Sequence, residues 1–231
     1  MSDLSKQWLE KKLGEICNIT SSKRIFQSEY IADGIPFYRT KEIKELANGK
    51  DVTTELFISE ERYRKIKINF GIPIAGDILL TAIGTIGEIY VIEADKEFYF
   101  KDGNVLWLKD FKLVNTYYLK LVLGSFVEKL KKLSNGSAYG ALSIEKLKNH
   151  TILLPPLEEQ KRIVKILDRA ESLRTMRRQS IEQLNTLTQA IFLEMFGDPV
   201  TNPKGWKRLA FGELLANISR SQRVEKGVES G

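Results

Sequence analysis

The chain has 231 residues, 42% of them hydrophobic and 29% charged, and 36 Lys and Arg against 30 Asp and Glu give a formal net charge of +6. This apolar fraction excludes a disordered chain, and the length suits one domain with an appendage or two small domains. The longest nearly uncharged stretch, 70–85, is too short for a membrane span, and residues 1–12 do not resemble a secretory signal. Because Cys17 is the only cysteine, we expect no internal disulfide and a cytoplasmic location.

The first 157 residues alternate short strand-like and helix-like runs, which predicts a mixed α+β domain. Apolar residues at helical spacing predict helices over 4–15, 60–65 and 115–133. Ser143 is expected to cap a further short helix, because its hydroxyl can accept a backbone N–H of the first turn. Strands are expected over runs rich in β-branched or aromatic residues, namely 35–39, 78–82, 87–92, 105–108 and 151–154.

A double proline, Pro155-Pro156, separates this domain from a segment, 157–196, that contains no glycine or proline. Neither proline can donate to a sheet, so the preceding strand must end there. Gly197 and Pro199 end the segment in the way that helices usually end. The sequence therefore predicts a mixed domain over 1–157, one helix of about 60 Å over 158–196, and a separate segment over 197–231.

An apolar heptad runs along the predicted helix. Its a and d positions are apolar except for a central polar layer of Arg177 and Ser180, and for Glu194 near the end. Such a layer usually fixes the register and number of partners in a coiled coil. We expect the helix to pair with an antiparallel copy of itself; the alternative is packing of its N-terminal half against the parent domain. The residues expected in the interface are Ile163, Ile166, Ala170, Leu173, Leu184, Leu187 and Ile191.

An internal repeat links the two ends of the chain. Trp8 is followed by Gly14-Glu15, and 198 residues later Trp206 is followed by Gly212-Glu213 at the same spacing. A period of this length is typical of duplicated domains. Residues from about 205 onwards are therefore interpreted as the start of a second domain copy, and those after about 200 are expected to be poorly ordered.

The sequence lacks the motifs of several enzyme classes. It has no Gly-rich Rossmann turn or Asn-Pro-Pro-Tyr tetrapeptide for adenosylmethionine, and no phosphate-binding loop for a nucleoside triphosphate. The single histidine, His150, borders a predicted strand and is interpreted as structural. Asp77, Glu93 and Lys96 loosely resemble a nuclease spacing that is common by chance. We therefore expect no catalytic residues and no metal site in this chain.

Several polar loops favour binding instead. They combine glycine or hydroxyl residues with lysine or arginine, which suits contact with phosphates, while arginine and asparagine can bind base edges. Each such loop alone is ordinary turn chemistry, and only their number in a basic domain favours a nucleic-acid surface. The loops are 21–24, 39–41, 81–87 and 134–140.

Together these features resemble the DNA-specificity (S) subunit of type I restriction-modification enzymes. The most specific match is the run from Leu154-Pro155-Pro156 through Glu159-Gln160 to Ile163-Val164, which resembles the family's Pro-Pro-Leu-x-Glu-Gln-x-x-Ile-Val segment. Supporting matches are Gly76-Asp77-Ile78, the opening Trp8 with Gly14-Glu15, and the 193–199 stretch, which resembles the junction before a second recognition domain.

The resemblance implies a non-catalytic subunit with two target-recognition domains, each followed by a long helix, the two helices pairing antiparallel as a spacer. Each domain would bind one half of a split site in double-stranded DNA. Adenosylmethionine, ATP and magnesium would be needed only by partner subunits, the modification (methyltransferase) subunits and the restriction subunits. With one recognition domain, this chain departs from that pattern, and we expect a half subunit that forms a homodimer.

Contact residues carry over only weakly from the family, because its recognition domains vary. We expect lysines to hold phosphates and the other residues to contact bases or grooves. The candidates are Lys23, Arg24, Arg39, Lys41, Thr85, Asn135, Ser137 and Tyr139. An alternative function is a truncated assembly or interference protein that docks on modification subunits through the helix without useful DNA specificity of its own.

Overall fold

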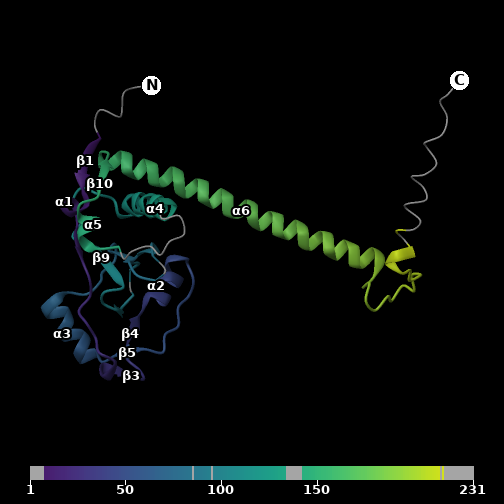
Figure 1. Cartoon of the computed structure of the whole chain (residues 1–231), viewed down its shortest axis with the longest axis horizontal. Coiled ribbons are helices and arrows are strands. Elements are labelled where there is room, and N and C mark those ends of the chain that lie inside the picture. The colour runs from purple at the N-terminus through teal and green to yellow at the C-terminus, as the bar shows by residue number, and fades with distance from the viewer. Residues whose placement is uncertain (1–7, 85, 95, 134–141, 214, 216–231) are drawn as a thin grey trace. The chain divides into compact units, whose positions relative to one another are not determined.

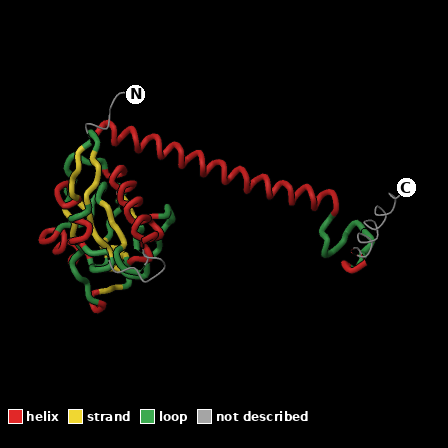
Figure 2. The backbone as a smooth tube through the Cα atoms, turned by 45° about the horizontal axis from the view of Figure 1, so that its top comes forward, coloured by secondary structure: helices red, strands yellow, loops and turns green. Residues whose placement is uncertain are grey.

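The computed structural model describes residues 8–84, 86–94, 96–133, 142–213 and 215. The chain divides into two compact units, Met1–Arg169 and Ala170–Gly231. The strands belong to the first unit, where helices lie around them (Figures 1 and 2). The expected α+β class with short strands is confirmed, and so is the long helix, α6 (Leu157–Phe196), which is continuous over 40 residues (Figure 1).

A four-stranded antiparallel sheet forms the centre of the first unit, in the order β2 (Asn18–Thr20), β9 (Val105–Lys109), β6 (Ile78–Thr81) and β7 (Ile89–Val91). Every residue of β6 is buried, because both faces of the strand are covered. Ile78 and Leu80 join one apolar cluster and Leu79 joins another. This explains why the strand has an unbroken apolar sequence instead of an alternating one.

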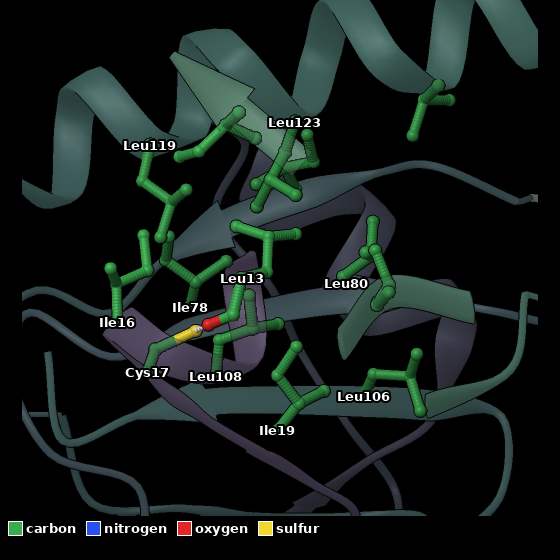
Figure 3. Packing of buried hydrophobic residues seen from close by; sticks show 14 of the residues in the cluster. Leu13, Ile16, Cys17, Ile19, Ile78, Leu80, Leu106, Leu108, Leu119 and Leu123 are labelled. Carbon is green, nitrogen blue, oxygen red and sulfur yellow. Dashed lines mark hydrogen bonds between the residues drawn. The ribbon is translucent and has the colours of Figure 1, made fainter. Parts of the chain in front are cut away.

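Helix α4 (Thr116–Leu133) covers one face of this sheet, and Leu119 and Leu123 point from it toward Ile78 and Leu80 (Figure 3). Cys17 belongs to the same cluster, and its thiol donates to the carbonyl of Leu13 at 3.3 Å. Burial raises the pKa of that thiol to about 12. Helix α2 (Thr40–Ala47) covers the other face with Ile43 and Leu46.

A second four-stranded sheet has the order β3 (Tyr30–Ile31), β5 (Phe57–Ile58), β4 (Ile35–Tyr38) and β8 (Tyr99–Phe100). Strands β4 and β8 are parallel, and the other neighbours are antiparallel. Helix α3 (Glu60–Phe70) packs on this sheet through Tyr63 and Ile66, and the short turn η2 (Gln27–Glu29) precedes β3. Helix α3 begins at residue 60 as expected, where Ser59 caps it, but it is longer than the predicted 60–65.

The predicted helix over 4–15 is wrong in its described part. Residues Leu9–Lys12 form strand β1, which pairs antiparallel with β10 (Thr151–Leu154), and only the four-residue turn α1 (Leu13–Ile16) is helical. Pairing with β10 satisfies the backbone groups, and this non-local interaction outweighs the local helical pattern. Helix α5 (Ile144–Lys148) confirms the expected cap, because the N–H of Lys146 donates to the Ser143 hydroxyl at 3.1 Å.

The second unit contains most of α6 and the segment that follows it. Gly197, with φ of +78°, donates from its N–H to the carbonyl of Leu193, and the ammonium of Lys204 donates to the last carbonyls, those of Glu194 and Met195. Residues 211–213 are helical, and residue 211 lies 198 residues after Leu13, the first residue of α1. The helical turn therefore recurs at the sequence repeat, but residues 207–210, which correspond to strand β1, form no strand. Disorder after about 200 stays a prediction.

Candidate nucleic-acid interface

The loop 21–26, which follows β2, lies between two hollows in the surface of the first unit. The hydroxyl of Ser21 accepts the N–H of Gly103 at 3.0 Å and donates to the carbonyl of Val105 at 3.1 Å. The N–H of Lys23 donates to the Tyr99 hydroxyl at 2.6 Å. These bonds fix the loop to β8, to β9 and to the segment between them, so Lys23 and Arg24 project from an anchored backbone.

The first hollow, of about 590 Å³, brings the predicted Arg24 and Arg39 together. Arg24 pairs with Asp102 at 2.9 Å between Nε and Oδ2, and it remains exposed. Lys101 also lines the hollow, together with the polar side chains of Gln27 and Asn104. Three cationic side chains with amide neighbours form a surface that can hold a phosphate or a base edge.

Arg39 is held in place by a buried carboxylate. Glu42, which is 1% exposed, accepts from the Arg39 backbone N–H at 2.8 Å and from its Nη2 at 2.9 Å. Burial opposes the ionisation of Glu42, but the hydrogen bonds from Arg39 outweigh it, so the pKa of Glu42 lies below its usual value. The same pair raises the pKa of Arg39. The guanidinium is thus charged and oriented while about half of its side chain is exposed.

The second hollow, of about 300 Å³, is lined by Lys23 and Lys109. The Lys23 ammonium lies 4.9 Å from the centre of the Phe70 ring, and that of Lys109 lies 4.0 Å from the centre of the Trp107 ring. Among the described residues, neither ammonium forms an ion pair. Two cations outside ion pairs, beside aromatic rings and the hydroxyls of the loop 21–26, suit a phosphate group.

Asp77 is hydrogen-bonded to Trp107, one of the residues that line this second hollow. It accepts from Trp107 Nε1 at 2.8 Å and from the Ile74 N–H at 3.1 Å, and it is 4% exposed. Burial raises the pKa of Asp77, although the hydrogen bonds from Ile74 and Trp107 act to lower it. Lys96 pairs with Glu93 at 2.8 Å, and the described residues contain no group of three His, Cys, Asp or Glu that could hold a metal ion.

The structure places Lys41 at a different hollow from Lys23, Arg24 and Arg39. The expected polar loop 39–41 is wrong, because Thr40 begins α2, and its first turn is stabilised by Arg39 and Glu42. Lys41 lies on α2 beside Lys44 and Lys50, around another hollow of about 410 Å³. The candidates Thr85, Asn135, Ser137 and Tyr139 lie outside the described residues.

Sequence reasoning missed Lys101 and Lys109, which line the two hollows. Lys101 directly follows β8 and Lys109 is the last residue of β9, so both lie outside the loops rich in glycine and hydroxyl residues that guided the prediction. Only the pairing of β2 with β9 brings Lys109 close to Lys23. His150, in contrast, is structural as expected: its ring stacks on Phe126 at 3.8 Å, and burial lowers its pKa.

The expected interface residues of α6 fall into two groups. Ile163 is partly buried against the core of the first unit, together with its neighbour Val164, which agrees with the alternative of parent-domain packing for the start of the helix. The others are exposed in this chain, the large ones by 45% to 61%. They are Ile166, Ala170, Leu173, Leu184, Leu187 and Ile191.

No described helix is long and apolar enough to cross a membrane.

The fold and these surfaces define a chain with one compact domain and one long helix that has an uncovered apolar stripe. The family model of the type I restriction modification DNA specificity domain matches residues 5–186. The chain belongs to this family, as the sequence motifs indicated.

Relatives of this chain are named as specificity subunits. One is a Haemophilus influenzae protein assigned as a type I restriction enzyme specificity subunit, 33% identical over 211 residues, which cover 90% of this chain and 48% of that protein. Another is the type I restriction enzyme EcoBI specificity subunit of Escherichia coli, 26% identical over 74% of this chain and 36% of that protein. The chain spans about half the length of the first curated relatives that it matches.

Solved structures show the same fold. The HsdS subunit from Thermoanaerobacter tengcongensis superposes with a TM-score of 0.61 at 24% identity, over 85% of this chain and 46% of that one.

Proposed function

We propose that this chain is the DNA-recognition half of a specificity subunit in a type I restriction-modification complex, and that it has no catalytic role. The observation that carries the proposal is the family match over residues 5–186 in a chain that spans about half of its first curated relatives. The first unit would bind one half of a split site in double-stranded DNA. Modification subunits, and through them restriction subunits, would supply catalysis with adenosylmethionine, ATP and magnesium.

The proposed DNA surface is the loop 21–26 with its two flanking hollows. Lys23 and Lys109 would hold a backbone phosphate, because they are unpaired cations beside hydroxyl groups. Arg24 and Arg39 would contact base edges, because their ion pairs leave guanidinium N–H groups available in a fixed orientation. Lys41, Thr85, Asn135, Ser137 and Tyr139 remain candidates for further contacts.

The division between phosphate and base contacts has a direct test. Lys23→Ala should weaken binding to all duplexes alike and reduce the salt slope by about one. Arg39→Ala should cost about 1–3 kcal/mol on the preferred site and relax specificity at one position. Arg64→Ala is the matched control, because Arg64 is an exposed, ion-paired arginine on α3. Identical salt slopes and footprints for the Lys23 and Arg39 variants would contradict this division.

We also propose that two copies pair through α6 in antiparallel orientation. In the register centred on the polar layer, Leu173 faces Leu184 of the second copy, and Arg177 faces Ser180. Ala170 then faces Leu187, and Ile166 faces Ile191, so each exposed apolar seam residue meets another. Ile163, which packs on its own domain, faces the polar Glu194. A two-fold dimer of this kind would bind a palindromic split site.

The dimer is tested by molar mass from light scattering at tens of micromolar. Leu184→Asp places a charge in the seam and should give the mass of one chain. Leu193→Asp is the matched control, since Leu193 is an exposed leucine of α6 outside the seam, and it should leave the mass at twice that of one chain. A wild-type protein with the mass of one chain would refute the pairing.

Methylated positions in DNA from cells that carry this chain with its modification partner test the function as a whole. A palindromic split motif that loses one specified base in each half-site with Arg39→Ala, and that is methylated less completely with Lys23→Ala, would support the proposal. Retention of modification subunits by the chain, with no retention of any duplex and no methylated motif, would instead support the assembly or interference function.

A further inference from the structure

Gln160 is the only fully buried polar residue of α6 in the part of the chain that the structure describes. Its Oε1 accepts the backbone N–H of Asn115 at 2.7 Å. Its Nε2 donates to the carbonyl of Leu113 at 3.1 Å and to that of Pro155 at 2.8 Å. One side chain in the first turn of α6 therefore joins the loop before α4, the start of α4 and the end of β10.

The loop that Gln160 contacts is itself in a constrained conformation. Leu113 has φ of +58°, although it is not a glycine, and its side chain is exposed. A leucine in this left-handed region is strained and persists only where surrounding contacts hold it. The bond from Gln160 Nε2 to the Leu113 carbonyl supplies such a contact. On the other side of Leu113, the N–H of Lys112 donates to the carbonyl of Ile16 at 2.8 Å.

The other contacts between α6 and the first unit do not fix an orientation equally well. Ile163 and Val164 pack against the core, but apolar burial is non-directional and tolerates rotation or sliding of the helix. Hydrogen bonds weaken steeply when their angles change. Three of them on one side chain therefore define how the first turn of α6 is rotated and tilted on the domain.

We propose that Gln160 is a positioning residue that fixes the direction in which the first turns of α6 leave the recognition domain, and so limits which spacing between half-sites the paired subunits accept. The consequence for spacing rests on the proposed function. One base pair more or less shifts a half-site by about 3.4 Å and rotates it by about a tenth of a turn. A joint that tilts freely over a helix of about 60 Å would accept several spacings.

The test measures the joint directly, without DNA. Spin labels at Glu128→Cys on α4 and Gln189→Cys on α6 report the distance between domain and helix, and the native Cys17 thiol is buried with a pKa of about 12. Labelled chain is diluted with an excess of unlabelled chain, so that distances between two copies do not contribute. Gln160→Met removes all three hydrogen bonds at similar volume. Gln179→Met, at an exposed glutamine of α6, is the matched control.

We expect a single narrow distance distribution for the wild type and for Gln179→Met, and a distribution at least twice as wide for Gln160→Met. If Gln160→Met fails to fold, Gln160→Glu replaces it, because its carboxylate can accept from Asn115 but cannot donate to the two carbonyls. Equal widths for the wild type and the folded Gln160 variant would overturn the proposal. Failure of the chain to dimerise or bind DNA would refute the proposed function and leave this measurement valid.

Discussion

Glu42 offers the sharpest test of how the candidate DNA surface is built. Its carboxylate is almost completely buried and accepts three hydrogen bonds from Arg39, two of them at 2.8 and 2.9 Å and a longer one from Nε at 3.4 Å. Glu42→Gln keeps the volume and one acceptor oxygen, but places an NH₂ group against the donors of Arg39. We expect a loss of about 1–3 kcal/mol in the free energy of unfolding.

The pH dependence of this loss gives a second, independent measurement. Because the pKa of Glu42 in the folded chain lies below its usual value, its stabilisation is present above the unfolded pKa of about 4.3 and disappears as the pH falls through the folded pKa. The deficit of Glu42→Gln should therefore be full at pH 7 and shrink in acid. Urea unfolding followed by tryptophan fluorescence at several pH values measures it.

A control separates this buried pair from ordinary surface charge. Glu60 pairs with Arg64 on α3 at 2.8 Å, and both side chains are exposed. Glu60→Gln should change the stability by less than about 0.5 kcal/mol, because exposed ion pairs contribute little. The reasoning fails if Glu42→Gln behaves like this control, or if its deficit is the same in acid as at pH 7.

Three further changes test local features by thermal or urea unfolding. Gly14→Ala should lower the free energy of unfolding by about 1–2 kcal/mol, because a Cβ there would lie 3.2 Å from the Lys148 Cβ on α5. Gly212→Ala should be nearly neutral, because a Cβ there would have no neighbour within 4 Å. Equal effects of the two substitutions would contradict the packing of α1 on α5. Ser143→Ala should cost about 1 kcal/mol through the lost cap, and an unchanged midpoint would show that the cap contributes nothing. Because the pKa of Asp77 is raised, the folded chain binds the proton of this carboxyl more tightly than the unfolded chain, and stability declines as the pH rises through that pKa. Asp77→Asn should remove this decline in stability. An unchanged pH profile would assign the decline to another group.

The parts of the fold with strong local signals could be predicted from the sequence. The double proline and the absence of glycine and proline from 157–196 gave α6 to within one residue at its start, and Ser143 gave the cap of α5. The apolar runs gave β6 and β9 because a strand buried on both faces has no polar alternation. The run from Pro155 to Gln160 was sufficient to identify the family. In each case the determining interaction lies within a few residues along the chain.

The sequence by itself therefore determined the class of domain, the long helix and its apolar stripe, and the family. Only the tertiary structure decided that residues 9–12 form a strand, because their partner β10 lies about 140 residues away in the sequence and no local pattern reveals it. It also decided which cations share a surface, since Lys23 and Lys109 meet only through the pairing of β2 with β9. Gln160 gains its role from partners more than 40 residues away, which the spacing of residues in the sequence does not reveal, whereas Glu42 pairs locally with Arg39 and only its burial depends on tertiary packing.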